Sequence, residues 1–383
     1  MRKILSLSIS AVILLGLSIQ KKPVSEIPSE EQLVQYLKSH WLTPEEYILA
    51  KFRDHDLVFL GEAHKVKHDV ELVHRLIPLL YQNGVANLGI EFGCYEYQDK
   101  VDRLVSAETY DEDLARWLLF KWGPYWPYKE YLDIYRKAWE LNKCLPPGAP
   151  KFRIVHLDYR ARWDLLKEQM SAAERRAVFF RGERDEHTAA VVIKEFVKSK
   201  KKALIYAGAI HAATRYSDPI ISDQKVVGFE EKRMGQIVFR KIPSRVFNIQ
   251  LHFPWPADID MKSFAYPVDG VIDRIMRGFG DKRIGFDVAG TPFGRLRDDD
   301  SYFAAGHKNF ALGMFCDGYV FQESFSESEG VTVDPLFITK ENFQEALDHL
   351  PNLKLRKIYK TPYQFLTDMG MKADFKLQYG DLK

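Results

Sequence analysis

Leu57-Val58-Phe59-Leu60-Gly61-Glu62-Ala63-His64 is the stretch that decides the fold, an apolar run that stops at a Gly-x-x-His tetrapeptide. The same pattern returns at residues 203–211, which end in Gly208-Ala209-Ile210-His211. Two further apolar runs, residues 85–90 and 152–157, each stop at an acid, Glu91 and Asp158. Short apolar runs of this kind, separated by helical patterns, are typical of buried parallel strands.

This alternation predicts an α/β fold with a mostly parallel central sheet flanked by helices. Residues 95–143 are mostly helical in pattern and longer than a plain crossover needs, so we expect a helical insertion there. From residue 253 onward, prolines and glycines interrupt every pattern. We therefore expect an α/β domain over residues 26–252 and an irregular C-terminal extension over 253–383, packed on that domain or forming a small subdomain.

Composition excludes several classes of function. The 383 residues carry 55 Lys and Arg against 53 Asp and Glu, a net charge of +2, so nucleic acid is not an expected partner. The three cysteines form no Cys-x-x-Cys motif, and their odd number argues against a disulfide framework. The chain contains no Gly-x-Gly-x-x-Gly, no P-loop and no Gly-x-Ser-x-Gly, so nucleotide binding and a serine triad have no support.

The N-terminus has the pattern of a targeting segment. Arg2 and Lys3 precede an apolar stretch over residues 4–19. We expect residues 1–25 to be a secretory signal or an uncleaved membrane anchor. The protein is then exported, to the periplasm or the cell surface or anchored in a membrane. The sequence leaves the oligomeric state open.

Acidic and imidazole side chains cluster where the expected strands end. In open α/β sheets the ligand crevice lies outside the carboxyl ends of the strands, so Glu62, His64, Glu91, Asp158 and His211 should meet at one rim. Two imidazoles and one carboxylate form the ligand set of a catalytic zinc site. We expect His64, Glu91 and His211 to bind a divalent metal (zinc, manganese or cobalt) or to act directly on substrate. Glu62 would be the general base or would orient His64.

Four further residues are candidates for supporting roles. His68 lies four residues after His64 and shares its face if a helix begins there; otherwise it is a surface residue at a helix start. Asp158 can orient a histidine or hold a ligand. Arg184 and Asp185 precede a helix, where an acid caps and an arginine can clamp an anion.

An aromatic run over residues 122–135 includes Tyr125, Tyr128 and Tyr131. Such a run is typical of a packed lid over the sheet. A tyrosine phenolate also ligates haem iron in some proteins, so Tyr128 and its neighbours are candidate haem-binding residues.

In these residues the chain resembles the Tiki/TraB/ChaN/erythromycin-esterase superfamily. The shared features are the first Gly-x-x-His at Gly61–His64, the strand-end Glu91, and the second Gly-x-x-His at Gly208–His211. The resemblance is strongest to the ChaN-like haem-binding uptake group, through Phe59–His64, Gly89–Phe92 followed by Gln98, Trp126-Pro127-Tyr128 and Arg184-Asp185. It covers roughly residues 50–220 and leaves the last 130 or so residues unmatched.

The resemblance implies different activities in different branches. Tiki-like members are metal-dependent proteases, erythromycin-esterase members use a Glu and a His as acid and base, and ChaN-like members bind haem at the membrane surface. We expect a metal-dependent hydrolase acting on a peptide or ester, or on another small molecule. The alternatives are a haem- or iron-binding uptake protein without catalysis, a metal-independent esterase-like hydrolase, and a non-catalytic surface protein. The chain lacks the cysteine of a ChaN lipoprotein and the Thr-His pairing often seen in the esterase turn.

Overall fold

The computed structural model describes residues 27–179 and 183–382. The expected targeting segment, residues 1–25, lies outside them. Among the helices of the described residues, none combines the length and the apolar character that a membrane span requires.

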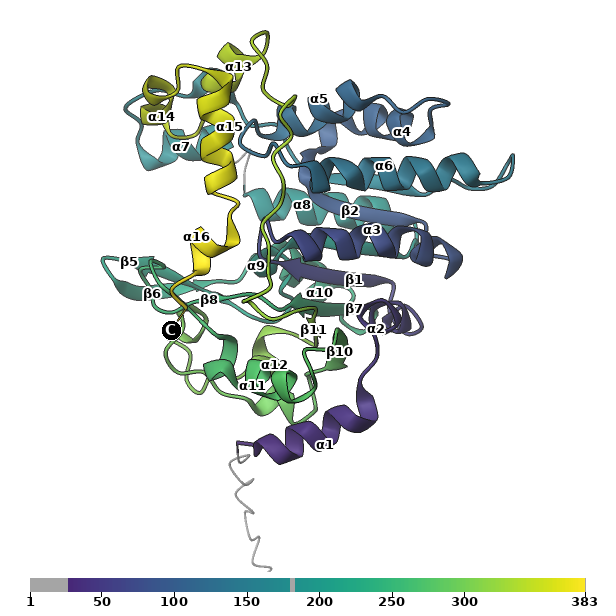
Figure 1. Cartoon of the computed structure of the whole chain (residues 1–383), viewed down its shortest axis with the longest axis vertical. Helices are drawn as coiled ribbons and strands as arrows, with labels where there is room; N and C mark the ends of the chain where they lie inside the picture. The colour runs from purple at the N-terminus through teal and green to yellow at the C-terminus, as the bar shows by residue number, and fades with distance from the viewer. Residues whose placement is uncertain (1–26, 180–182, 383) are drawn as a thin grey trace, which may run out of the picture.

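A seven-stranded sheet with the order β10-β11-β7-β1-β4-β2-β3 forms the centre of the molecule (Figure 1). All neighbouring strands run parallel except β10, which is antiparallel to β11. Two small two-stranded sheets, β5-β6 and β8-β9, stand apart from it. The strands are β1 (Leu57–Glu62), β2 (Asn87–Cys94), β3 (Arg153–Asp158), β4 (Ala203–Gly208), β5 (Asp218–Ser222), β6 (Lys225–Glu230), β7 (Val246–Leu251), β8 (Trp255–Pro256), β9 (Phe264–Ala265), β10 (Ile284–Asp287) and β11 (Gly318–Phe321).

Helices cover both faces of this sheet, which confirms the predicted α/β fold. The helices are α1 (Glu30–His40), α2 (Pro44–Lys51), α3 (Lys67–Gln82), α4 (Gln98–Ser106), α5 (Glu112–Trp122), α6 (Lys129–Cys144), α7 (Ala172–Phe179), α8 (Arg184–Val192), α9 (Ala209–Ala212), α10 (Met234–Lys241), α11 (Val271–Gly278), α12 (Leu312–Phe315), α13 (Phe343–Asp348), α14 (Leu353–Ile358), α15 (Pro362–Met371) and α16 (Phe375–Tyr379).

The alternation of side chains along β1 divides the apolar residues between two cores. Val58 and Leu60 belong to the core that includes buried residues of α3, α4, α5 and α6. Leu57 and Phe59 belong to the core that includes buried residues of α8 and α10. A strand that buries both faces needs an uninterrupted apolar run, because successive side chains point to opposite faces. That requirement explains why residues 57–60 are all apolar.

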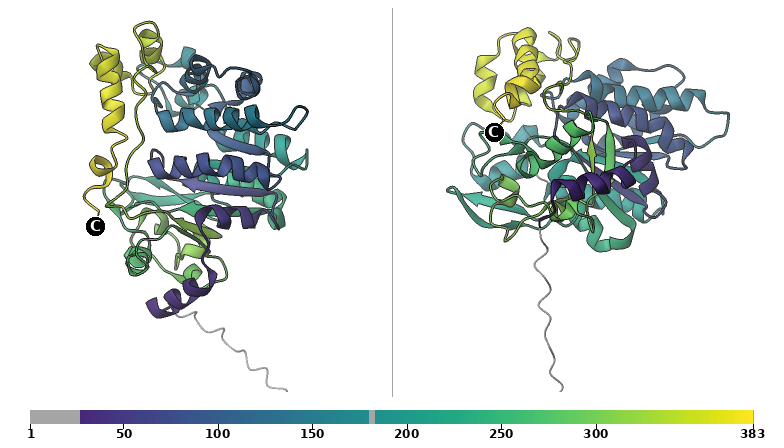
Figure 2. Two further views of the ribbon diagram at one scale, coloured as in Figure 1. Left: turned by 45° about the vertical axis from the view of Figure 1, so that its right-hand side comes forward. Right: turned by 60° about the horizontal axis from the view of Figure 1, so that its bottom comes forward.

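The expected helical insertion is present as α4, α5 and α6, which lie between β2 and β3 in sequence. The C-terminal region contributes strands to the central sheet itself. β10 and β11 both come from beyond residue 252, so the central sheet crosses the expected domain division. The last helices, α15 and α16, then run past the rim where the parallel strands end (Figures 1 and 2).

Candidate active site

A buried carboxylate holds the first histidine of the candidate site. Glu62 is the last residue of β1, and its Oε1 lies 2.9 Å from Nδ1 of His64. Tyr131 donates its hydroxyl hydrogen bond to Glu62 Oε1 at 2.9 Å, and Tyr206 donates another to Oε2. Glu62 is 1 % exposed, whereas 39 % of the His64 side chain is exposed. The Nδ1 edge of the imidazole is therefore fixed, and the Nε2 edge is left toward the rim.

The two groups perturb each other. Burial raises the pKa of the Glu62 carboxyl, and the hydrogen bonds from His64, Tyr206 and Tyr131 counteract only part of that effect. Burial alone would lower the pKa of His64, but the hydrogen bond and the charge of Glu62 outweigh it and raise this pKa. His64 is therefore a stronger base than an ordinary imidazole.

Glu91 lies inside β2, because this strand continues to Cys94 beyond the expected end at position 91. The pairing of β2 with β3 shifts register between Ile90 and Cys94, an irregularity that re-aims side chains near a site. Glu91 accepts hydrogen bonds from the Gly208 amide at 2.7 Å and from Arg184 Nη2 at 2.7 Å. Burial opposes ionisation here, but His211 and Arg184 hold the pKa of Glu91 well below its usual range.

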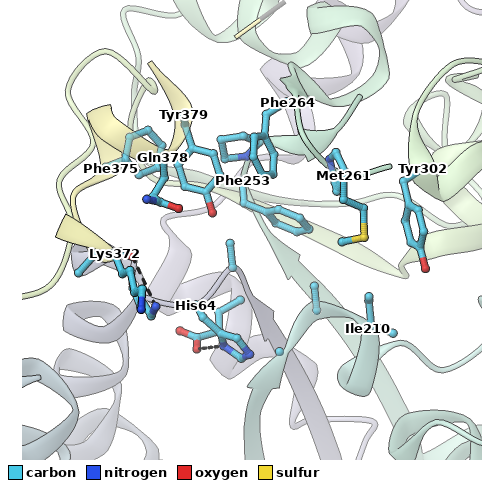
Figure 3. Close-up of a pocket in the computed structure, with 18 of the residues that line it drawn as sticks. His64, Ile210, Phe253, Met261, Phe264, Tyr302, Lys372, Phe375, Gln378 and Tyr379 are labelled. Atoms are coloured by element: carbon cyan, nitrogen blue, oxygen red, sulfur yellow. Dashed lines mark hydrogen bonds and ion pairs between the residues drawn. The ribbon is translucent and has the colours of Figure 1, made fainter. Parts of the chain in front are cut away.

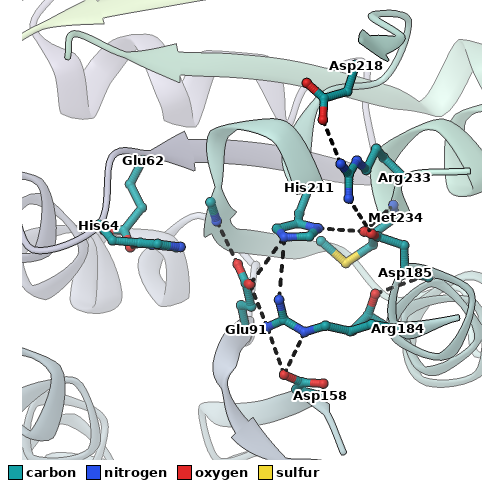
Figure 4. A network of polar contacts seen from close by, with 12 residues as sticks. Glu62, His64, Glu91, Asp158, Arg184, Asp185, His211, Asp218, Arg233 and Met234 are labelled. Atoms are coloured by element: carbon teal, nitrogen blue, oxygen red, sulfur yellow. Dashed lines mark hydrogen bonds and ion pairs between the residues drawn. The ribbon is translucent and has the colours of Figure 1, made fainter. Parts of the chain in front are cut away.

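Arg184 and Asp185 connect Glu91 to the second histidine (Figure 4). Arg184 donates from Nε to Asp158 at 2.9 Å, and its Nη1 lies 3.5 Å from Nε2 of His211. Asp185 Oδ1 lies 2.7 Å from Nδ1 of His211. Burial would raise the pKa of Asp185, yet the contacts with His211 and Arg233 lower it. The structure thus brings together the predicted residues Glu62, His64, Glu91, Asp158, Arg184, Asp185 and His211.

Two predicted residues lie outside this cluster. His68 is in the first turn of α3, where its Nδ1 lies 2.6 Å from Glu323 and its Nε2 lies 3.4 Å from Asp69. Tyr128 is fully buried and donates its hydroxyl hydrogen bond to the Met369 carbonyl at 3.1 Å. Both side chains already have protein partners away from His64.

A cavity of about 380 Å³ opens at the rim with His64 in its lining (Figure 3). Its walls are mostly apolar, and many of the lining side chains come from beyond residue 252: Phe253, Met261, Phe264, Tyr302, Phe375 and Tyr379. A second cavity of about 310 Å³ also includes His64 and is lined by Glu91, Tyr125, Asp158 and Arg184. His64 therefore lies between an apolar cavity and a charged one.

The cluster does not fit the expected metal site. A guanidinium group, that of Arg184, lies 2.7 Å from Glu91 and 3.5 Å from His211, where these two ligands would have to face a cation. Within residues 27–179 and 183–382, no three His, Cys, Asp or Glu side chains are placed to hold a metal ion. The expectation of zinc, manganese or cobalt gains no support from this geometry.

Sequence reasoning missed two residues at the site. Tyr206 lies in an apolar run, where the one signal of its role is that a buried tyrosine hydroxyl usually has a hydrogen-bond partner. Lys65 lines the apolar cavity in a left-handed backbone conformation, with φ +74°, which no sequence pattern revealed. Burial, followed by the charge of Lys372, lowers the pKa of Lys65 to about 8.

Comparisons with solved structures found several proteins to which this chain is similar. A protein described as a succinoglycan biosynthesis protein superposes with a TM-score of 0.50 at 13% identity, over 77% of this chain and 97% of that one. An erythromycin esterase in its open conformation gives 0.48 at 13% identity, over 76% and 94%. ChaN of Campylobacter jejuni, described with cofacial haem, gives 0.36 at 14% identity, over 57% and 88%. At 13% identity, the similarity to the succinoglycan biosynthesis protein concerns the fold alone.

Comparison at the level of sequence finds similarity over one part of the chain. A search of curated proteins found no match to this chain. One family model matches residues 48–144, which include β1, His64, β2 and the helical insertion, and its description is "Haem-binding uptake, Tiki superfamily, ChaN". This match confirms, over residues 48–144, the resemblance of the chain to the ChaN group of the Tiki superfamily.

Proposed function

We propose that this protein is a metal-independent hydrolase in which His64 is the general base. The observation that carries the proposal is the Glu62–His64 pair, a buried carboxylate 2.9 Å from one ring nitrogen of a histidine at a cavity. A carboxylate in that position fixes the tautomer and the orientation of the ring and stabilises its protonated form. Two tyrosine hydroxyls in turn hold the carboxylate.

The reaction is the hydrolysis of an ester. Nε2 of His64 takes a proton from a water molecule as the water oxygen bonds to the ester carbonyl carbon. The bond from that carbon to the alcohol oxygen then breaks, and His64 returns the proton to the leaving alkoxide. Arg184 lines the second cavity beside His64, so its guanidinium is the positive group assigned to the charge that develops on the carbonyl oxygen.

The remaining charged residues would act as positioning groups. Glu91 is an ionised carboxylate held between Arg184 and the Gly208 amide, which fixes the guanidinium from one side. Asp158 fixes it from the other side at 2.9 Å. Asp185 and His211, which contact each other, complete this group of positioning residues. In this proposal none of the four exchanges a proton with substrate.

The test is the hydrolysis of p-nitrophenyl hexanoate by the wild type, His64→Ala and the control His40→Ala. His40 is an exposed residue at the end of α1, where its ring stacks on Tyr36. We expect His64→Ala to lower kcat/KM by about 100-fold or more, as loss of a general base does, and His40→Ala to leave it unchanged. A chelator should have no effect. Activity that survives in His64→Ala, or that is lost on chelation and restored by zinc, would overturn the proposal.

Haem binding is the second candidate, and it is supported by the description of the matching family model. The tyrosines do not favour it. Tyr128 and Tyr131 use their hydroxyls inside the protein, and burial raises the pKa of Tyr125 to about 12, which disfavours the phenolate that would ligate iron. His64, which lines both cavities, is then a candidate ligand. A Soret shift on titration with haemin that disappears in His64→Ala would establish this alternative.

We further propose that the chain is exported, because Arg2, Lys3 and the apolar residues 4–19 have the pattern of a secretory signal. Cell fractionation of the full chain and of a variant with Asp in the apolar stretch tests this. Equal distribution of the two proteins between compartments would contradict export.

A further inference from the structure

Lys65 gives the apolar cavity a positively charged group that forms no ion pair with a carboxylate of the described residues, although the charge of Asp368, which pairs with Lys372, also acts on it. Lys65 follows His64 directly and contributes to the lining of the cavity. Its Nζ donates to the Lys372 carbonyl at 3.4 Å and lies 5.4 Å from the centre of the Trp126 ring and 5.7 Å from that of Tyr128. An ammonium carries three donors, and the Lys372 carbonyl is the single protein acceptor that the described residues give this one.

The backbone of Lys65 gives a second and independent reason to assign it a role. Its φ of +74° lies in the left-handed region, which favours glycine or asparagine and costs a lysine about 1 kcal/mol or more. Two hydrogen bonds hold this conformation: the Lys65 amide donates to the Tyr131 hydroxyl at 3.1 Å, and the Val331 amide donates to the Lys65 carbonyl at 3.0 Å. The fold therefore places a lysine where a smaller residue would fit with less strain.

The other charged groups of the cavity are already neutralised. Lys372 pairs with Asp368 at 2.7 Å, one turn earlier on α15. Glu62 is the only acid among the lining residues of the described chain, and His64 and two tyrosines engage it. Much of the remaining lining is apolar, with Phe253, Phe264 and Phe375 among its side chains (Figure 3). The cavity therefore combines one unpaired cation with an extended apolar surface.

We propose that this cavity binds an amphipathic carboxylate, with the anionic group on Nζ of Lys65 and the hydrocarbon chain along the apolar wall formed by the C-terminal residues. A carboxylate supplies acceptors for the Lys65 ammonium. Transfer of the hydrocarbon chain from water to the apolar wall lowers the free energy of the complex. The inference rests on the proposed function in one respect: the hydrolysed substrate is then an ester whose acyl chain ends in a carboxylate. The anion site itself does not require that hydrolysis occur.

Calorimetric titration of the full chain with octanoate and with 1-octanol tests the anion site directly. The two probes share a hydrocarbon chain and differ in charge, and neither is hydrolysed. We expect Lys65→Gln to weaken octanoate binding about tenfold or more and to leave octanol binding unchanged. Lys65→Arg should retain octanoate binding. The matched control is Lys376→Gln, an exposed lysine of α16 outside the cavity lining, which should change neither affinity.

A second experiment measures the hydrolysis of two esters, p-nitrophenyl hexanoate and the mono-p-nitrophenyl ester of adipic acid. The adipate ester differs by a terminal carboxylate. Lys65→Gln should raise KM for the adipate ester about tenfold and leave KM for the hexanoate ester unchanged. Octanoate binding that is equal in Lys65→Gln and the wild type would overturn the inference, as would equal affinity of the wild type for octanoate and octanol. Lys65-dependent octanoate binding without hydrolysis of either ester would overturn the hydrolase proposal alone.

Discussion

The imidazole of His64 packs so tightly against Gly208 that a Cβ atom at position 208 would lie 2.9 Å from its Cε1 atom and 3.1 Å from its Nε2 atom. The two residues belong to the two Gly-x-x-His motifs of the chain. Parallel pairing of β1 with β4 places Glu62 opposite Gly208 and so brings the motifs side by side. The glycine of the second motif thus provides the space in which the histidine of the first can turn toward the rim.

Gly208→Ala should therefore displace the His64 ring and lower the hydrolytic rate while the protein remains folded. Gly208 has a φ of −55°, which alanine adopts without strain, so the effect is a steric one on the ring. A displacement of about 1 Å can cost about 100-fold in kcat/KM. Ester hydrolysis and thermal unfolding measure the two effects. The control is Gly228→Ala, since a Cβ there meets only Ile220 at 3.9 Å. Full activity in Gly208→Ala would contradict the assigned position of His64.

Glu62→Gln should lower kcat and shift its pH dependence. The general base acts in its neutral form, so the rate falls as the pH drops through the pKa of His64, which Glu62 raises above 6.5. Loss of the carboxylate charge lowers that pKa, so the acidic limb of the profile moves to lower pH, while the plateau falls by about 100- to 10,000-fold. Glu323→Gln, which changes the partner of His68, should alter neither quantity. An unchanged acidic limb in Glu62→Gln would exclude His64 as the titrating base.

Asp69 should make the protein less stable as the pH rises. Burial raises its pKa to about 7, with the charge of His68 acting in the opposite direction. The folded state therefore holds the proton more tightly than the unfolded chain. The associated stability is fully present below the unfolded pKa of about 3.9 and is lost as the pH rises through about 7, by up to about 4 kcal/mol. Denaturant unfolding of the wild type and Asp69→Asn at pH 4 to 8 measures it. If the free energy of unfolding changed with pH in the same way in both proteins, Asp69 would not be the group responsible.

Arg184→Met should destabilise the fold. The substitution leaves Glu91 and Asp158, which are 3% and 5% exposed, without their shared cation. Removal of one partner from a buried ion pair costs about 3–5 kcal/mol. The free energy of unfolding in urea is the measurement. Arg162→Gln, which breaks an exposed pair with Asp164, should leave it unchanged. Equal stability of Arg184→Met and the wild type would show that the two carboxylates have other support.

Local sequence was sufficient to predict many of the strands and helices that carry the site. The apolar runs that became β1 and β4 and the helical pattern over 95–143 were recognisable because burial and helix formation impose short periods on neighbouring residues. The capping boxes of α1 and α2, at Ser29 and Thr43, are equally local. The convergence of Glu62, His64 and His211 also followed, because parallel strands end at the same rim.

Contacts between distant residues were beyond such reasoning. Arg184 lies between Glu91 and His211, where the sequence led us to expect a metal, and its pairing with Glu91 across 93 residues leaves no trace in a local pattern. β10 has only four residues, too few for a recognisable period, although it pairs with β11 and extends the central sheet beyond residue 252.

By itself, the sequence determined which side chains could reach the rim, because strand and helix periods and Gly-x-x-His turns are properties of neighbouring residues. Tertiary structure alone decided their chemistry. It placed Tyr131 and Tyr206 on Glu62, put a guanidinium beside Glu91, and closed the cavity with residues from the C-terminus such as Phe375. The physical reason is that the charge and basicity of a site depend on burial and on partners that only the folded chain brings together.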